Sequence, residues 1–237
     1  MDLDAYFDDE DIQNVYIPLL KELDEIQKRK KERIYLFIGA CPGTGKTTLV
    51  LFLEWLSKQI GINNTFQCLG LDGFHYPNSY LMTHTIKENG KEICMMDRKG
   101  GPETFDVEAL KEKIIESKQV NNLWPIYSRI DHDVKEDAIQ CTANIILLEG
   151  NYLLCNDERY NILEGLWDKS LLILEDEKVL QKRLWNRKIK GGLTQEQATR
   201  FCEASDYKNI SYVLNTYKQA DIILIMDNYK LIRPKNV

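Results

Sequence analysis

The sequence predicts an α/β fold of three layers, in which a mainly parallel sheet has helices on both faces and a small lid. Short, continuous apolar runs alternate with longer segments of helical periodicity, and strands buried on both faces give such unbroken runs. The chain of 237 residues, 43% of them hydrophobic, is long enough for one such domain. We therefore divide it into an N-terminal acidic segment with a helix, residues 1–33, and a main domain, residues 34–237.

The individual elements follow from apolar spacing and from end signals. A first helix is expected over about residues 12–31, with Pro18 as a candidate break near its start. Gly61 ends a second helix, Asp106 caps a third, and Thr194 opens a later one through a capping box. In chain order the expected elements are a strand at 34–38, a helix at about 46–60, a strand at 65–71, an irregular stretch at 73–105, a helix at about 107–118, strands at 123–127 and 144–148, a helix near 158–166, a strand at 171–174, a helix at 179–190, the Thr194 helix and a last strand at 221–226.

A glycine-rich turn joins the first strand to the second helix and ends in Gly-Lys-Thr. In this setting the backbone N–H groups can converge on a triphosphate, because glycine lacks the Cβ that would hold the phosphates away. Lys46 is expected to reach the β- and γ-phosphates, and Thr47 to ligate Mg²⁺. The strict motif has glycine where this chain has Ala40. The residues expected to hold ATP are Gly43, Thr44, Gly45, Lys46, Thr47 and Thr48. The turn predicts a P-loop NTPase fold; the alternative is an ordinary strand-to-helix turn.

Two carboxylates follow apolar strands, and ligands of parallel sheets bind beyond the carboxyl ends of the strands. Asp72 follows the second strand, and Glu149 follows the strand at 144–148. Phosphoryl transfer needs a group that orients and deprotonates the acceptor hydroxyl, and it needs a metal. We assign the first role to Asp72 and metal ligation to Glu149. The alternative for each is an acid that faces solvent.

The basic helix at 179–190 is the candidate lid. Arg183 and Arg187 are four residues apart and share one face, which suits closure over phosphates and stabilisation of the transferring charge. Gly191 and Gly192 supply a hinge, so the lid spans about residues 183–193. The alternative is a plain solvated helix.

Composition limits the kinds of partner. The net charge of −6 argues against a broad nucleic-acid surface, and no apolar run is long enough to span a bilayer. The six cysteines contain no Cys-x-x-Cys pair, and the acidic N-terminus lacks the basic start of a secretion signal. These features indicate a reduced, cytoplasmic protein. Whether the chain forms a homodimer, through the first helix or the basic run at 28–31, stays open.

Four segments occur in series: Asp-Gly-Phe-His within 71–78, Arg-Lys-Gly-Gly-Pro-Glu-Thr-Phe-Asp at 98–106, Pro-Ile-Tyr-Ser-Arg at 125–129 and Glu-Gly-Asn-Tyr-Leu-Leu within 147–154. Together they resemble the phosphoribulokinase/uridine kinase family of P-loop kinases over about residues 34–226. The nearest match is the uncharacterised nucleoside or sugar kinase-like group related to bacterial pantothenate kinase.

The resemblance implies an ATP- and Mg²⁺-dependent kinase that acts on a small hydroxyl compound. Asp72 matches the family's catalytic carboxylate, Glu149 the acid near metal and substrate, and Arg183 and Arg187 the lid arginines. The catalytic set is therefore Asp72, Lys46, Arg183 and Arg187. The segment at about 73–105 matches the substrate-side insertion. The candidate substrate residues are His75, Arg98, Tyr127, Arg129 and His132.

The indications for the acceptor conflict. His132 follows Tyr127 by five residues, as in uridine kinases, whereas the segment at 98–106 is more similar to pantothenate kinases. The acceptor is thus left as a nucleoside, a sugar or a pantothenate-like metabolite. The alternative function is a regulatory NTP-binding or NTP-hydrolysing protein, although the chain lacks a guanine-reading Asn/Thr-Lys-x-Asp segment. Ser205, Asp206 and Asn209 match the nearest group but receive no role.

Overall fold

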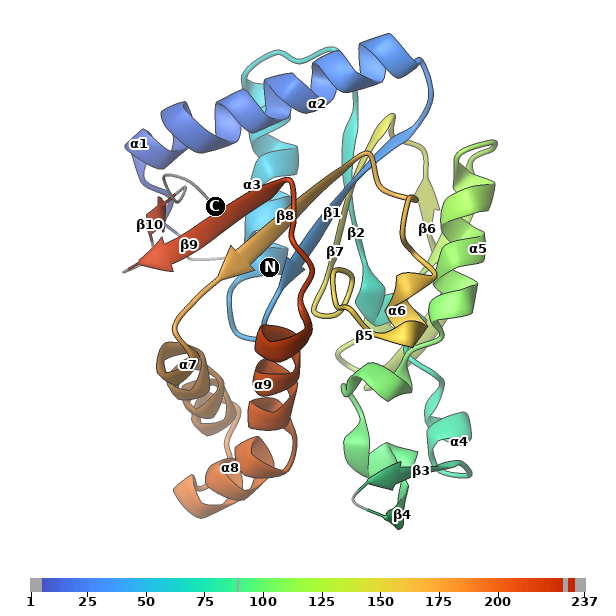
Figure 1. Ribbon diagram of the computed structural model, residues 1–237, viewed down its shortest axis with the longest axis vertical. Coiled ribbons are helices and arrows are strands. Elements are labelled where there is room, and N and C mark those ends of the chain that lie inside the picture. Colours follow the sequence, from blue (N-terminus) through green and yellow to red (C-terminus); the bar gives the residue numbers. More distant parts are fainter. Residues whose placement is uncertain (1–5, 89, 228–229, 233–237) are drawn as a thin grey trace.

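A mainly parallel sheet forms the centre of the fold (Figure 1). The structure is a computed structural model and describes residues 6–88, 90–227 and 230–232. The sheet has six strands in the order β10-β9-β8-β1-β7-β2, and β10 alone runs antiparallel to its neighbour among these described strands. Their bounds are Ile34–Ala40 for β1, Phe66–Gly70 for β2, Ile145–Gly150 for β7, Lys169–Leu174 for β8, Ile222–Asp227 for β9 and Lys230–Ile232 for β10. The predicted α/β class is confirmed.

The register of the sheet brings chemically useful residues to one edge. Ile38 of β1 and Gly70 of β2 both pair with Glu149 of β7. The loop after β1, the turn after β2 and the Glu149 side chain therefore meet where the parallel strands end, which is the edge at which such sheets bind ligands.

Helices cover both faces of the sheet (Figure 1). Their bounds are Ile17–Lys30 for α2, Lys46–Gln59 for α3, Val107–Ser117 for α5, Glu158–Asn161 for α6, Glu177–Lys190 for α7, Gln195–Phe201 for α8 and Tyr207–Thr216 for α9. Leu36 and Ile38 of β1 lie in a buried cluster with residues of α2 and α3. Tyr35 and Phe37 point the other way, into a cluster with α5, α6, α7 and α9. This alternation along β1 is what a strand buried between two helical layers requires.

The N-terminal helix passes through Pro18 without a break. A short α1 (Asp9–Asp11) leads into a π-helical turn at Ile12–Tyr16, which continues into α2. Pro18 lies in the first turn of α2, where its missing N–H and fixed φ are tolerated. The expected break near the start is therefore wrong. Within the described residues, no helix combines the length and the apolar content that crossing a membrane requires.

The stretch at 73–105 is more regular than its sequence indicates. It contains α4 (Asn78–Leu81) and an antiparallel hairpin of β3 (Thr85–Glu88) and β4 (Lys91–Cys94). Both strands have four residues, and half of their side chains are exposed, so they show no clear apolar alternation and were not predicted. The stretch also holds three 3-10 turns, at Leu71–Phe74, Met95–Arg98 and Pro102–Thr104.

One further expectation is confirmed and extended by the structure, and two are corrected. The short strand at 123–127 is β5 (Asn122–Ser128), and it pairs with β6 (Asp133–Cys141) in a separate two-stranded sheet. Most of β6 is exposed and polar, which hid it from apolar patterning. The helix near 158–166 is only the four residues of α6, and β9 is followed by β10 rather than ending the sheet.

Candidate active site

The phosphate loop bends sharply between β1 and α3. Gly43 and Gly45 have φ angles of 85° and 92°, a left-handed conformation that strongly favours glycine. A Cβ on Gly43 would also lie 3.1 Å from Leu184 Cγ of α7, so the loop packs closely against the candidate lid helix. Ala40 ends β1 as a buried strand residue and does not share the positive φ of the two glycines. The departure from the strict motif at Ala40 therefore costs no backbone strain.

Lys46, Thr47 and Glu149 are joined by direct contacts. Lys46 Nζ donates to Asn151 Oδ1 at 2.6 Å and lies 3.8 Å from Glu149 Oε2. Thr47 Oγ1 donates to Glu149 Oε1 at 2.6 Å. Burial raises the pKa of the Glu149 carboxyl above its usual range, and the charge of Asp72 adds to this, whereas Lys46, the Thr47 hydroxyl and Arg129 act in the opposite direction. A buried carboxylate with these neighbours can bind a cation, which would replace its proton or one of its present side-chain contacts.

The Thr47–Glu149 pair fits the expected magnesium site. A hydroxyl and a carboxylate are hard oxygen donors, and protein-bound Mg²⁺ commonly uses one or two such side chains together with substrate phosphates and water. Within the described residues, no group of three or more His, Cys, Asp or Glu side chains has the arrangement of a metal site. Asn151, which holds Lys46, was not singled out from the sequence, although it lies in the Glu-Gly-Asn segment.

Asp72 lies in the 3-10 turn that follows β2, with its side chain exposed. Its negative charge acts to raise the pKa of Glu149, His75 and Tyr127, so its carboxylate lies within electrostatic range of all three. The turn is docked tightly on β5, since a Cβ on Gly73 would lie 2.2 Å from the Pro125 carbonyl oxygen. The structure therefore brings Asp72 to the same edge as Glu149 on a rigid support.

His75 and Tyr127 form an aromatic wall beside Asp72. The His75 ring lies 3.9 Å from the Phe105 ring and 5.1 Å from the Tyr127 ring, measured between centroids. His75 Nδ1 also lies 2.8 Å from the Asp72 carbonyl oxygen, so the donor of this hydrogen bond is the ring. Burial is the main cause that lowers the pKa of His75 and that raises the pKa of Tyr127. The wall presents a neutral imidazole and a protonated phenol at neutral pH.

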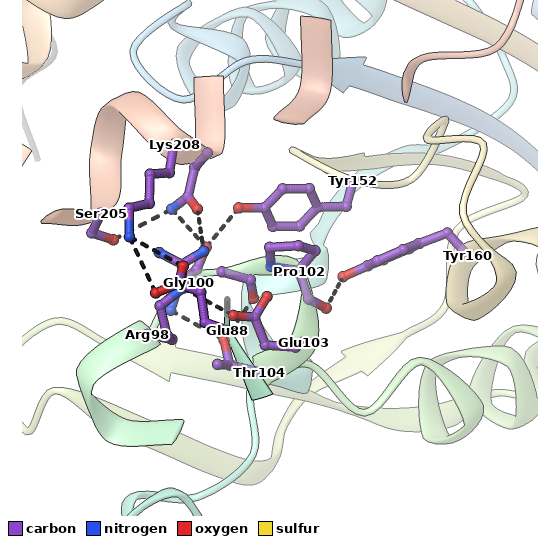
Figure 2. Close-up of polar contacts among 12 residues, drawn as sticks. Glu88, Arg98, Gly100, Pro102, Glu103, Thr104, Tyr152, Tyr160, Ser205 and Lys208 are labelled. Carbon is purple, nitrogen blue, oxygen red and sulfur yellow. Dashed lines mark hydrogen bonds and ion pairs between the residues drawn. The ribbon is translucent and has the colours of Figure 1, made fainter. Parts of the chain in front are cut away.

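Arg98 is buried in the contact between the substrate-side insertion and α9 (Figure 2). Its Nε donates to Glu103 Oε1 at 3.0 Å, and Nη2 lies 3.5 Å from Asn209 Oδ1. Nη1 is buried and has no hydrogen-bond partner among the described residues. The expected contact of Arg98 with an acceptor stays a prediction, because the guanidinium is enclosed by protein groups in this structure.

Asn209 gains a structural role from this arrangement. The Gly100 carbonyl oxygen accepts from Asn209 Nδ2 at 3.2 Å and from the Tyr152 hydroxyl at 2.7 Å, and Figure 2 shows the Tyr152 hydroxyl directed toward Gly100. Tyr160 holds the next turn through the Pro102 carbonyl at 2.8 Å. Asn209 thus ties the start of α9 to the segment at 98–104. The sequence indicated Asn209 only as a residue shared with the nearest group. It did not indicate the contacts of Asn209 with Arg98 and Gly100.

The two candidate lid arginines differ in their surroundings. Arg183 is half-buried and pairs with Glu175 at 2.9 Å, close to Met226 of β9. Arg187 is exposed on the next turn of α7. The capping box at Thr194 is present, as predicted, and opens α8. The roles of both arginines in closure remain predictions.

Arg129 and His132 lie around the turn between β5 and β6. Arg129 is exposed, and its charge acts on Glu149. His132 has a φ of 52°, and its backbone carbonyl, rather than its ring, takes part in the local network: it accepts from Lys99 Nζ at 2.6 Å.

A separate cavity of about 380 Å³ lies between α5 and the segment at 73–77 and includes neither the phosphate loop nor Glu149.

Fold and site together define the class: a P-loop kinase. No family model matches the chain. It is 38% identical over 225 residues to the "Uncharacterized protein YggC" of Escherichia coli, covering 94% of this chain and 91% of that protein. It is 23% identical over 233 residues to the "Putative uridine kinase C227.14" of Schizosaccharomyces pombe, and the match covers 93% of this chain and 97% of that protein. It is 27% identical over 169 residues to the pantothenate kinase of Bacillus velezensis, and the match covers 62% of this chain and 50% of that protein.

Solved structures agree with this class. The crystal structure of a "putative fructose transport system kinase" from Silicibacter sp. TM1040 matches with a TM-score of 0.77 and 25% identity, over 88% of this chain and 98% of that chain. The chain belongs to the phosphoribulokinase/uridine kinase family of P-loop kinases, in its YggC-like group, and the resemblance seen in the sequence is confirmed. It is a phosphotransferase with an alcohol group as acceptor.

Proposed function

We propose that the protein transfers the γ-phosphoryl group of ATP to a hydroxyl group of a nucleoside, a sugar or a pantothenate-like metabolite. One observation carries the proposal: Lys46, Thr47, Glu149 and Asp72 lie at one sheet edge, and Thr47 Oγ1 and Lys46 Nζ lie 2.6 and 3.8 Å from the Glu149 carboxylate. This is the set of groups that phosphoryl transfer requires.

Each group has a defined task in the proposed reaction. Asp72 orients the acceptor hydroxyl and receives its proton as the acceptor oxygen bonds to the γ-phosphorus. The bond between that phosphorus and the bridging oxygen breaks, and ADP leaves. The loop N–H groups and Lys46 hold the β- and γ-phosphates. Thr47 and Glu149 would hold Mg²⁺, which would neutralise charge on the phosphate oxygens.

The contacts of Lys46 and of α7 support the proposed phosphate site. Lys46 Nζ is held by Asn151 and lies close to Glu149, so its ammonium is already directed along the sheet edge before a nucleotide arrives. Leu184 of α7 packs against Gly43 of the phosphate loop. The helix that carries Arg183 and Arg187 therefore lies next to this loop. We assign to them the stabilisation of transferring charge.

The test is a screen of nucleosides, sugars and pantothenate-like alcohols with ATP and Mg²⁺, read by mass spectrometry for phosphorylated products. Asp72→Asn should abolish transfer and leave ATP binding intact, whereas Asp97→Asn, at an exposed aspartate of the stretch at 73–105, should behave as wild type. Full transfer by Asp72→Asn would remove Asp72 as the base. ATP hydrolysis that no acceptor stimulates would favour the regulatory alternative.

A further inference from the structure

The acceptor side of the site contains a lysine that the sequence analysis did not use. Lys99 follows the enclosed Arg98, but its ammonium points to the aromatic wall instead: Nζ lies 5.1 Å from the centroid of the Tyr127 ring. It donates to the His132 carbonyl at 2.6 Å and to the Asn78 side-chain oxygen. All three partners are neutral.

Lys99 therefore carries a charge that its contacts do not neutralise. Among the described residues, no carboxylate forms an ion pair with its ammonium, and the nearby Asp133 uses its Oδ1 to accept backbone N–H groups of Asn78 and Val134. The side chain is half-buried, and burial is the main cause that lowers its pKa, opposed by the charge of Asp133. A partly desolvated cation with neutral partners gains from an anion brought by a ligand.

Arg129, close to Tyr127 in the sequence, adds a second positive charge. It follows Tyr127 by two residues at the end of β5, and no described residue forms an ion pair with its exposed guanidinium. Its charge acts on Glu149, whereas that of Lys99 acts on His75. Both cations thus lie within electrostatic reach of the groups around Asp72.

We propose that the acceptor is an anionic alcohol, whose carboxylate or phosphate group binds at Lys99 and Arg129 while its hydroxyl lies at Asp72. This inference rests on the proposed kinase function. Tyr127 and His75 lie between the two ends and contact the apolar part of such a molecule. Arg98 Nε and Nη2 already contact Glu103 and Asn209, so the proposal assigns the anion to Lys99 and Arg129.

The first experiment compares matched acceptors with ATP and Mg²⁺. Hydroxy acids are paired with their neutral amides, and sugar phosphates are paired with their parent sugars. Higher kcat/KM for the charged member, by about 10- to 100-fold for one charge-assisted contact, supports the proposal; the two arms tell carboxylate from phosphate. Neutral acceptors that are phosphorylated equally well overturn it while leaving the kinase function standing. Absence of transfer to every acceptor would instead refute the kinase function.

The second experiment asks whether Lys99 recognises charge or only supports the fold. Lys99→Met keeps the length of the side chain and should raise KM for the charged acceptor by about 10-fold or more, with kcat/KM for its neutral partner and KM for ATP nearly unchanged. Lys99→Arg should restore much of the loss. Lys87→Met, an exposed lysine of β3, is the matched control. An equal loss for charged and neutral acceptors in Lys99→Met would overturn the assignment.

Discussion

Gly73→Ala tests whether the support of Asp72 is as tight as the structure indicates. A Cβ on Gly73 would lie 2.2 Å from the carbonyl oxygen of Pro125 and 2.6 Å from its carbonyl carbon. Close carbon–oxygen contacts in proteins begin at about 3.3 Å, so the turn that carries Asp72 must move away from β5 by about 1 Å. A displacement of this size at a catalytic group costs about 100-fold in rate.

The same displacement should destabilise the protein. Overpacking of this kind costs about 2 kcal/mol, which lowers Tm by about 4–8 °C for a chain of this size. The assay is kcat with the best acceptor, together with thermal unfolding and a separate measurement of ATP binding. Binding of ATP should persist, because the phosphate loop lies between β1 and α3, whereas the atoms nearest an added Cβ on Gly73 belong to Pro125 and Ile126.

Gly70→Ala is the matched control for this variant. It lies two residues before Asp72, and its added Cβ would meet Glu149 Oε1 at 3.8 Å and the Asp72 nitrogen at 3.9 Å, both ordinary contacts. Its kcat should stay within about twofold of wild type. Wild-type kcat and Tm in Gly73→Ala would refute the account of how Asp72 is held.

Three further predictions concern other contacts. Thr47→Val removes the hydroxyl that donates to Glu149 at 2.6 Å and should lower kcat by about 100-fold even at high Mg²⁺, while Thr47→Ser keeps activity; equal activity of the two variants would contradict metal ligation by Thr47. Asn209→Ala leaves the Arg98 Nη2 without this partner and should cost about 2 kcal/mol of unfolding free energy, whereas Asn215→Ala, exposed on the same helix, should cost less than about 0.5 kcal/mol; similar losses would contradict the role of Asn209. Burial lowers the pKa of His75 below its ordinary value of 6.5, so its contribution to stability is complete above pH 6.5 and is lost as the pH falls through the folded-state pKa; His75→Gln should flatten the fall of Tm in mild acid, and an unchanged slope would contradict this.

Local signals gave the ends of elements and the phosphate loop. The Asp106 side chain accepts from the Ala109 N–H, and the Thr194 capping box is present, because such caps depend on residues within one turn. The strand–loop–helix order around Lys46 is local in the same sense. Convergence of the loop, Asp72 and Glu149 was predictable as well, because parallel strands end at a common edge.

Contacts between segments far apart in the chain could not be predicted from the sequence. Arg98 and Asn209 are 111 residues apart, and no local pattern around either residue indicates their contact. The sequence indicated Arg98 as one of the candidate substrate residues but did not single out Lys99, whose ammonium the structure directs toward Tyr127 while Arg98 pairs with Glu103. Which of two adjacent side chains points into a site depends on the 3-10 turn at Met95–Arg98, and short turns of this kind leave no periodic pattern.

The proposed reaction transfers the γ-phosphoryl group of ATP to an alcohol whose hydroxyl lies at Asp72. Phosphorus NMR of the protein with ATP, Mg²⁺ and an acceptor mixture follows this transfer, since a phosphate monoester, inorganic phosphate and ADP give separate signals. We expect one new phosphate monoester for each ADP formed, and loss of this signal in Asp72→Asn. Formation of ADP with inorganic phosphate alone, at a rate that no acceptor changes, would contradict it.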